Sequence, residues 1–499
     1  MIQNPGQKNA RRAVMIAAIT MIVLHRLFYC FIRPEQIPTL HIRIAELLVA
    51  GQVWALCFYG KAKTHMDRLL LCYVLWAVFT RIMLRDFSEE ISLEMLCLVE
   101  MCIAFYAGAH LDSRDAENVL KTVTGVFCGV LTLWVLFGLP VVLTNTERTD
   151  FFDMYVTIYQ EQEGALRFLN FSAAHRNESS CWFMIGIWLL VYQWMTCKRK
   201  LWRIPMALSM ALFYLGIALQ HSRSIYVITA LGVAALAALA LQKRDMKKLW
   251  KTVLTVLAVL VCALVVYKSF SWCNDGVNRL SSRMKAAQST AQLPETEPEQ
   301  LPMEETAPQL PEPAPQPEQL PENTEAPLSE QNAPQQTEVP VDDSMADGRS
   351  FLKDLLTLTM RTEIWHTEAF VLKHYPTFLI FGQKMDSIPT NLIHYGGLGR
   401  EVSHLHDGLL QIVAMYGLLG LVLFAAFLVL LFLKNLKILF SDVPLPKKVL
   451  VILVLGLFVY SFMEPMFSAH LGLTSALFML LAGMISRESE QPIQPEEHV

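Results

Sequence analysis

Two polar segments of this chain carry side chains suited to handling charge. Arg361 begins the sequence Arg-Thr-Glu-Ile-Trp, and on a helix Arg361, Trp365 and Glu368 share one face at spacings of four and three. A guanidinium offers fixed, paired N–H donors and keeps its charge, which suits a phosphate or a carboxylate. The plainer alternative is a surface helix in which Arg361 pairs with Glu368 or Glu363.

The second segment places His404 and His406 just before an apolar stretch that starts near residue 408. Histidine is the usual general base near neutral pH. Polar groups so close to a hydrocarbon boundary are costly unless they are paired or work at a site. Two histidines at i and i+2 could instead bind a metal or have no role at the interface. Because no third ligand is near in the sequence, we predict no metal site and take His406 as the candidate base.

Other polar residues flank short turns between apolar stretches. Arg223 lies in the turn His-Ser-Arg-Ser, where it either snorkels to the interface or meets an anion. Supporting candidates in comparable positions are His175, Arg176, Asn177, Glu464 and His470.

Membrane-length apolar stretches dominate the rest of the chain. Of its 499 residues, 54% are hydrophobic and 17% are charged, whereas about 25% are charged in an average soluble protein. We therefore predict an all-α, polytopic membrane protein. Its twelve expected spans are 13–32, 42–60, 68–85, 92–110, 119–143, 179–197, 201–220, 224–242, 250–270, 408–433, 447–464 and 468–486. Most of the ten cysteines lie in these stretches without metal-ligand spacing, so we expect neither a disulfide nor zinc.

The orientation of the spans follows from lysine and arginine, which collect in alternate connections. The connections at 198–203 and 243–251 are the most basic. Such connections face the cytoplasm in membrane proteins, so we place both termini there. The segments then expected on the outer side are 144–178, 221–224, 271–407 and 464–470.

This orientation brings Arg223, Arg361 and His406 to the outer face at one depth, although they are far apart in the sequence. Two arginines and a histidine suit a lipid-linked diphosphate donor. The arginines would bind the phosphates and the histidine would accept a proton from an attacking hydroxyl.

The predicted organisation follows the spans. We expect spans one to nine in 1–270, an extracytoplasmic loop in 271–407, the last three spans in 408–486 and a cytoplasmic tail in 487–499. Within the loop, 291–343 is rich in Pro, Glu and Gln and is predicted to be a disordered spacer. The part from 349 to 407 has apolar residues at helical spacing, which predicts amphipathic helices on the outer membrane face.

The motifs resemble those of the O-antigen ligase/polymerase family of bacterial membrane proteins. They are Arg-Thr-Glu-Ile-Trp at 361–365, His406-Asp407-Gly-Leu-Leu-Gln followed by Gly417-Leu-Leu-Gly420, and Ser222-Arg223-Ser224. One long outer loop before the last spans adds to the resemblance, which covers roughly 165–485. Asp407 stands where the family usually has Asn, and the insert at 291–343 is not a family hallmark.

The resemblance implies transfer of a glycan from a polyprenyl-diphosphate-linked oligosaccharide to an acceptor hydroxyl, without metal, nucleotide sugar or other cofactor. The acceptor would be another glycan, a lipid or a protein, at the outer face of the bacterial cytoplasmic membrane. His406 would activate the hydroxyl, and Arg361 and Arg223 would stabilise the departing diphosphate. Polymerisation of a surface or capsular polysaccharide is favoured over ligation. A chain-length regulator and a flippase are implied neighbours, and nucleic acid is not an expected partner.

Two other classes stay open. A flippase for lipid-linked sugars also fits twelve spans, but transporters tend to have polar residues at the membrane midplane and related halves. Here the mid-span positions are largely apolar and the two halves look unlike. The other class is a sensor or scaffold that binds cell-wall material through the outer loop.

Overall fold

The computed structural model describes most of the helical part of the chain. The described residues are 64–86, 89–144, 148–151, 156–163, 166–171, 176–220, 222–242, 248–291, 361–399, 402, 405–467 and 472–488, with parts of 13–27. Several predictions lie outside them: the span at 42–60, the spacer beyond Ala291, His175, His404, His470 and the side chain of Arg223.

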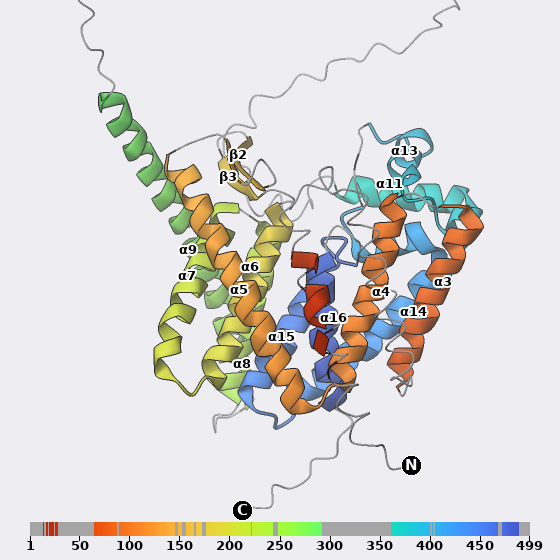
Figure 1. Cartoon of the computed structure of the whole chain (residues 1–499), viewed down its shortest axis with the longest axis horizontal. Helices are drawn as coiled ribbons and strands as arrows, with labels where there is room; N and C mark the ends of the chain where they lie inside the picture. The colour runs from red at the N-terminus through yellow and green to blue at the C-terminus, as the bar shows by residue number, and fades with distance from the viewer. Residues whose placement is uncertain are drawn as a thin grey trace, which may run out of the picture.

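Long helices form most of the described fold (Figure 1). They are α3 (His65–Leu84), α4 (Glu89–His110), α5 (Ser113–Leu143), α6 (Arg176–Thr196), α7 (Arg203–Gln220), α8 (Arg223–Gln242), α9 (Lys248–Ala291), α14 (Gly408–Leu439), α15 (Leu445–Tyr460) and α16 (Gly472–Glu488). These ten helices overlap ten of the predicted spans. The helical fold of the prediction is confirmed, whereas the total of twelve spans and their orientation stay predictions.

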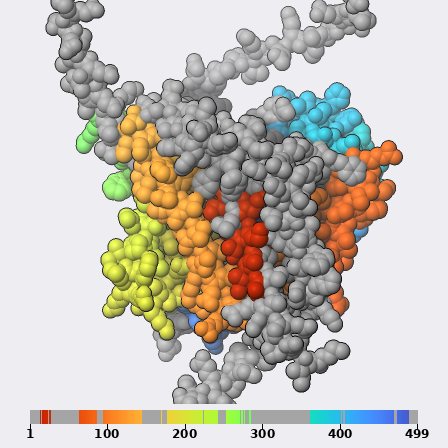
Figure 2. Space-filling model, in the orientation of Figure 1, coloured from red at the N-terminus to blue at the C-terminus, as the bar shows by residue number. Residues whose placement is uncertain are grey.

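Five of the described helical stretches are long and apolar enough to cross a membrane, as expected of an integral membrane protein. They are Ser113–Leu143, Lys200–Gln220, Ser224–Leu241, Thr252–Phe270 and Gly408–Leu439. In the space-filling view, α5 and α7 lie at the surface of the bundle (Figure 2). Their exposed side chains include Leu133, Phe137 and Leu208. Such a surface suits hydrocarbon better than water.

A small antiparallel sheet follows α5, which the all-α prediction did not include. Its strands β1 (Arg148–Phe151), β2 (Val156–Glu163) and β3 (Leu166–Phe171) pair in the order β1-β2-β3. Ile158 pairs with Phe171 across β2 and β3, and Ile158 and Leu169 are both buried. The sequence of β3, Leu-Arg-Phe-Leu-Asn-Phe, does not alternate strictly between apolar and polar residues, so it carries no clear strand signal. This segment was therefore expected only as an outer connection.

The segment predicted to be an outer loop contains three described helices. They are α11 (Arg361–His374), α12 (Pro376–Phe381) and α13 (Ser387–His394). They lie at the same end of the bundle as the sheet (Figure 1). The start of the loop differs from the prediction, because α9 continues as one helix from the apolar stretch to Ala291. No proline interrupts the sequence between Phe270 and Pro294, although the Ser, Asn, Asp and Gly residues just after Phe270 are poor helix formers.

α12 is fixed against a kink in α14. Gly417 has φ 68° within α14, and a Cβ at this position would lie 2.1 Å from the backbone oxygen of Ile380. Gly382, with φ 83°, approaches Met415 equally closely from the other side. Only glycine tolerates both this backbone conformation and this approach. The first glycine of the Gly-x-x-Gly motif thus has a structural role, which is to allow α12 to pack closely against α14.

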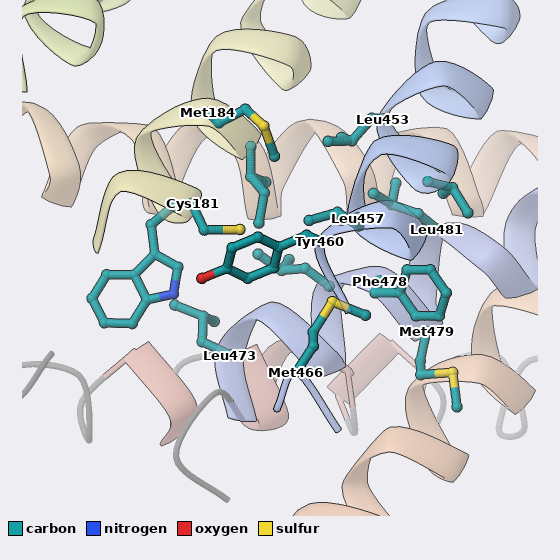
Figure 3. Packing of buried hydrophobic residues seen from close by; sticks show 14 of the residues in the cluster. Cys181, Met184, Leu453, Leu457, Tyr460, Met466, Leu473, Phe478, Met479 and Leu481 are labelled. Carbon is teal, nitrogen blue, oxygen red and sulfur yellow. The ribbon is translucent and has the colours of Figure 1, made fainter. Parts of the chain in front are cut away.

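The centre of the bundle is tightly packed. α4 crosses α16 so closely that a Cβ on Gly108 would lie 2.3 Å from the oxygen of Leu480. Small residues permit such close helix pairs in membranes. Between α6, α15 and α16 the interior is filled by aliphatic, aromatic and sulfur-containing side chains (Figure 3). The hydroxyl of Tyr460 points from this cluster toward the start of α6, where the polar contacts begin.

The bundle also buries acidic side chains, and one of them, Glu100, lies in the middle of the predicted span 92–110. Glu100 of α4 is 1% exposed and pairs with Arg26, and its Oε1 lies 2.8 Å from His25 Nδ1. Asp67 Oδ2 lies 3.2 Å from His110 Nε2. A buried charge is costly unless a partner compensates it. The partners come from other helices, so the linear sequence could not show these pairs.

Candidate functional site

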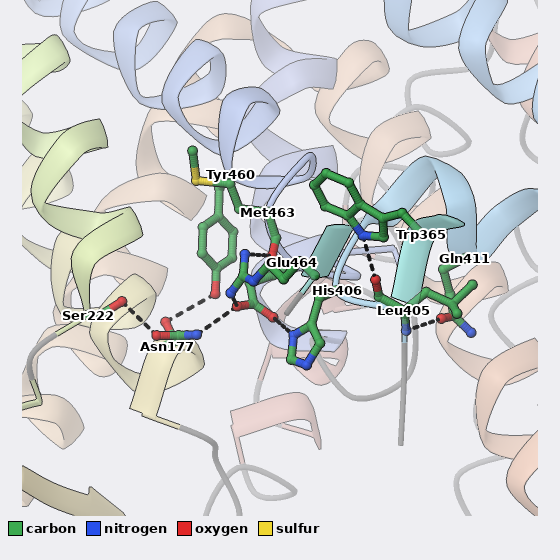
Figure 4. Close-up of polar contacts among 10 residues, drawn as sticks. Asn177, Ser222, Trp365, Leu405, His406, Gln411, Tyr460, Met463 and Glu464 are labelled. Atoms are coloured by element: carbon green, nitrogen blue, oxygen red, sulfur yellow. Dashed lines mark hydrogen bonds and ion pairs between the residues drawn. The ribbon is translucent and has the colours of Figure 1, made fainter. Parts of the chain in front are cut away.

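One carboxylate, that of Glu464, connects three distant segments of the chain (Figure 4). Its Oε1 accepts hydrogen bonds from Arg361 Nη2 and from Asn177 Nδ2, both at 2.7 Å. Its Oε2 lies 3.3 Å from His406 Nδ1. Glu464 is only 3% exposed and lies in the turn after α15. The carboxylate therefore orients a guanidinium, an amide and an imidazole at one point.

Asn177 is held in place from three directions. Ser222 Oγ donates to Asn177 Oδ1 at 2.9 Å, which leaves the amide nitrogen directed at Glu464. The hydroxyl of Tyr460 donates to the backbone oxygen of Asn177 at 3.1 Å. Asn177 lies in the first turn of α6, and Ser222 directly precedes α8. The starts of two helices thus converge on the same polar cluster.

Arg361 is the first residue of α11 and reaches the turn after α15. Besides its ion pair with Glu464, its Nη1 donates to the backbone oxygen of Met463. Pairing with Glu363 or Glu368, the plainer alternative, is not what the structure shows. The side chain of Arg361 is 15% exposed. Because a guanidinium has five N–H donors, these two contacts leave capacity for a further anion.

His406 lies in a turn that three contacts fix. Trp365 Nε1 donates to the backbone oxygen of Leu405 at 2.9 Å, and the Leu405 amide donates to Gln411 Oε1 at 3.2 Å. Asp407 caps α14 by accepting from the Leu410 amide at 2.7 Å. His406 itself has φ 52°, a left-handed conformation that few residue types adopt readily.

The role of Asp407 in this turn is therefore structural. Asparagine caps helices about as well as aspartate, so the departure from the family motif at this position keeps the backbone function. Burial raises the pKa of the Asp407 carboxyl, and hydrogen bonds from the amides of Leu409 and Leu410 oppose this rise.

A second polar cluster lies about two turns further along α11. Glu368 is fully buried and its Oε1 accepts from Gln383 Nε2 at 2.7 Å. The backbone N–H of Gln383 donates to the backbone oxygen of Ala414 in α14, and the backbone oxygen of Gln383 accepts from Arg81 Nη1 of α3 at 2.9 Å. Among the described residues, Glu368 Oε2 has no hydrogen-bond partner. This cluster anchors the helix that carries Arg361.

Glutamine in place of Glu368 should stabilise the protein at pH 8 and change little below pH 5. Burial raises the pKa of Glu368 from 4.5 to about 7, so the folded protein keeps a proton that the unfolded chain releases. The free energy of unfolding therefore falls as the pH rises from 4.5 through 7 and is flat above. Because one pKa unit corresponds to about 1.4 kcal/mol, Glu368→Gln should recover roughly 3 kcal/mol at pH 8. Unfolding of the detergent-solubilised variants at both pH values measures this.

The matched control for this prediction is Glu363→Gln, because Glu363 is exposed on the same helix. It should leave the free energy of unfolding unchanged at both pH values. A Glu368→Gln protein that is less stable than the wild type at pH 8 would mean that the ionised carboxylate is the form the fold requires.

The structure brings together four of the residues proposed from sequence: Arg361, His406, Asn177 and Glu464. Trp365 and Asp407 support the backbone of the His406 turn. Arg176 starts α6 beside Asn177 and is partly buried. The residues that sequence reasoning did not propose as site residues are Tyr460, Met463, Ser222 and Gln411. Tyr460 stands four residues before Glu464 at the end of an apolar stretch, and this spacing was the available signal.

The arrangement is suited to proton transfer beside an anion. With Nδ1 directed at a carboxylate, Nε2 is the basic nitrogen of neutral His406, and the carboxylate would stabilise the imidazolium that forms. Arg361 lies on the same carboxylate and can donate to a phosphate. Among the described residues no group of three His, Cys, Asp or Glu side chains has the geometry to hold a metal.

Residues 207–425 match the model of a family described as O-Antigen ligase. The match confirms the resemblance drawn from the motifs, and it includes Arg223, Arg361 and His406. Asn177 and Glu464 lie outside the matched region. No curated protein matches the chain. The matched residues make up less than half of the chain, and the match indicates glycan transfer as the class of activity.

Proposed function

We propose that this O-antigen-ligase-like protein transfers a glycan from a polyprenyl-diphosphate-linked oligosaccharide to an acceptor hydroxyl. The hydroxyl oxygen forms a bond to the anomeric carbon while the bond from that carbon to the diphosphate oxygen breaks. The proton of the hydroxyl passes to His406 Nε2, and the diphosphate departs with the bonding electron pair. Arg361, with Arg223, stabilises the negative charge that builds on the departing group.

The observation that carries this proposal is that Arg361 and His406 are held by one carboxylate, that of Glu464. The base and the anion-binding group are thereby fixed relative to each other before any substrate binds. Preorganised groups of this kind lower a barrier because they need not reorient during the reaction. Ser222, which directly precedes Arg223, bonds to Asn177 in the same cluster, and this supports including Arg223.

We assign the site to the outer face of the bacterial cytoplasmic membrane. The support is the distribution of lysine and arginine, which concentrate in connections such as 198–203 and 243–251 at the other ends of the helices. Among the possible acceptors we favour a second lipid-linked repeat, which makes the protein a polymerase of a surface polysaccharide. Ligation to a lipid or protein acceptor is the alternative. A chain-length regulator and a flippase are the partners such a polymerase would need.

Proteoliposomes that contain the purified protein and lipid-linked repeat units test the proposal. A ladder of products would identify a polymerase, and a single transfer to an added lipid or protein acceptor would identify a ligase. The absence of any transfer by folded protein would contradict the proposal. It would instead favour a flippase for lipid-linked sugars. The buried ion pair of Glu100 and Arg26 supports this alternative, because charged residues inside a membrane often mark a transport pathway.

Arg361→Lys should reduce transfer in this assay by about 10- to 100-fold. A lysine ammonium is a point charge that cannot bond to Glu464, to the Met463 oxygen and to a phosphate with the geometry of a guanidinium fork. Lys373→Arg, an exchange of the same two side chains on the exposed surface of α11, serves as control. Transfer by Arg361→Lys at the wild-type rate would remove Arg361 from the diphosphate site.

A further inference from the structure

A groove lies at the opposite end of α14 from the candidate site. Its walls are His65 and Met66 at the start of α3, and Leu430, Leu433, Lys434 and Lys437 in the last turns of α14. Its volume is about 340 Å³. Residues 408 and 437 are 29 positions apart, so at 1.5 Å per residue the groove is roughly 40 Å from the His406 turn. The proposed transfer reaction makes no use of it.

The groove combines an apolar floor with a basic rim. Met66 is buried at its base, whereas Leu430 and Leu433 are exposed on the surface of a helix long and apolar enough to cross the membrane. Lys434 and Lys437 are three residues apart and therefore lie on the same face of α14. Apolar surface at the level of the hydrocarbon, with cationic groups directly beyond it, is the pattern that a phospholipid complements.

We propose that this groove binds one anionic phospholipid. Lys434 and Lys437 would hold its phosphate, with His65 on the facing wall, and the start of one acyl chain would lie along Leu430 and Leu433. A soluble anion fits less well, because it would have to lie against the leucines, which need an apolar partner. The exposure of Leu433, at 56%, also leaves the groove open sideways, toward the bilayer.

A second pocket at this end of the bundle shows what distinguishes the first. It is lined by residues of α4, α5, α6, α14, α15 and α16 and includes Lys447 and Arg487, but also Glu117. A carboxylate on the wall opposes an anion. Among the described residues that line the groove between α3 and α14, two are lysines and none is acidic, so the charge of this lining favours an anionic occupant.

Thermal unfolding of the full-length protein in mixed micelles tests the proposal. Phosphatidylglycerol should raise Tm more than phosphatidylcholine at the same mole fraction. The double variant K434Q/K437Q should lose at least half of this additional shift. The matched control K198Q/K200Q removes the same charge from another connection predicted to be cytoplasmic and should keep the shift. Inorganic phosphate, added in place of phosphatidylglycerol, should not produce the additional rise in Tm.

Retention of the lipid, measured by native mass spectrometry, gives a second readout that does not depend on stability. Leu430→Trp, which fills the apolar part of the groove, should reduce phosphatidylglycerol retention several-fold while the charges remain. Equal losses of the phosphatidylglycerol effect in K434Q/K437Q and K198Q/K200Q would overturn the proposal in favour of diffuse charge attraction. Equal Tm shifts with phosphatidylglycerol and phosphatidylcholine would overturn it as well. Neither outcome bears on the transfer reaction, which is assayed separately.

Discussion

The rate of glycan transfer should fall by roughly 10²- to 10⁴-fold when His406 is replaced with asparagine, the range expected for loss of a general base. Asparagine is the sharper choice than alanine because His406 has φ 52°, and asparagine adopts this left-handed conformation more readily than most residues. The turn should therefore keep its backbone, while no side chain remains that can accept the proton. Initial rates in the proteoliposome assay measure the effect.

Two comparisons make the result specific. His394→Asn makes the same chemical change at an exposed position of α13 and should transfer at the wild-type rate. Binding of the lipid-linked donor to the His406→Asn protein should persist, because Arg361 and Glu464 are unchanged. If His406→Asn retained more than a tenth of the wild-type rate, the base would have to be another group.

The sequence predicted Arg361 and His406 because the features that mark them are local. Each lies in a short polar segment beside an apolar stretch, and arginine and histidine are the residue types that anion binding and proton transfer require. The supporting roles of Trp365 and Asp407 were only partly predictable. Their motifs are visible in the sequence, but the contacts to Leu405 and Leu410 depend on how the turn folds.

The central position of Glu464 could not be predicted in the same way. Nothing in its neighbourhood separates it from His470, which flanks the same turn. Its partners Asn177, Arg361 and His406 are 287, 103 and 58 residues away. Only the packing of α6, α11 and α15 brings these segments together, and no pattern in a single sequence encodes that packing.

The spans themselves were predictable because hydrocarbon imposes length and composition on each helix separately. Departures arise where this constraint ends. α9 continues to Ala291, past its apolar part, and the segment after α5 forms strands outside the apolar stretches. The buried pair of Glu100 and Arg26 escaped notice for a related reason, since a mean over an apolar stretch hides one charged residue whose partner lies on another helix.

Glu464→Gln should lower the rate of transfer by about 10- to 100-fold, as loss of a group that orients a catalytic residue generally does. Glutamine has the shape of glutamate, so the chain can pack as before. Its amide, however, carries no charge and has only one oxygen to accept bonds. It cannot accept from Arg361 and Asn177 and also hold the imidazolium of His406. The effect should fall on kcat more than on the KM for the donor, because the imidazolium forms only during the reaction.

A double-mutant cycle separates this orienting role from a purely structural one. If Glu464 acts through His406, the variant Glu464→Gln should have little further effect in a protein that already carries His406→Asn, because the base is gone. Glu464→Asp retains the charge but is shorter by one methylene. Compared with Glu464→Gln, it should restore the stability of the protein more than the rate of transfer. Independent, multiplicative losses in the double variant would mean that Glu464 serves the fold through Arg361 and Asn177 alone. In that case the proposed link between the carboxylate and the base would be wrong, while the assignment of His406 would stand.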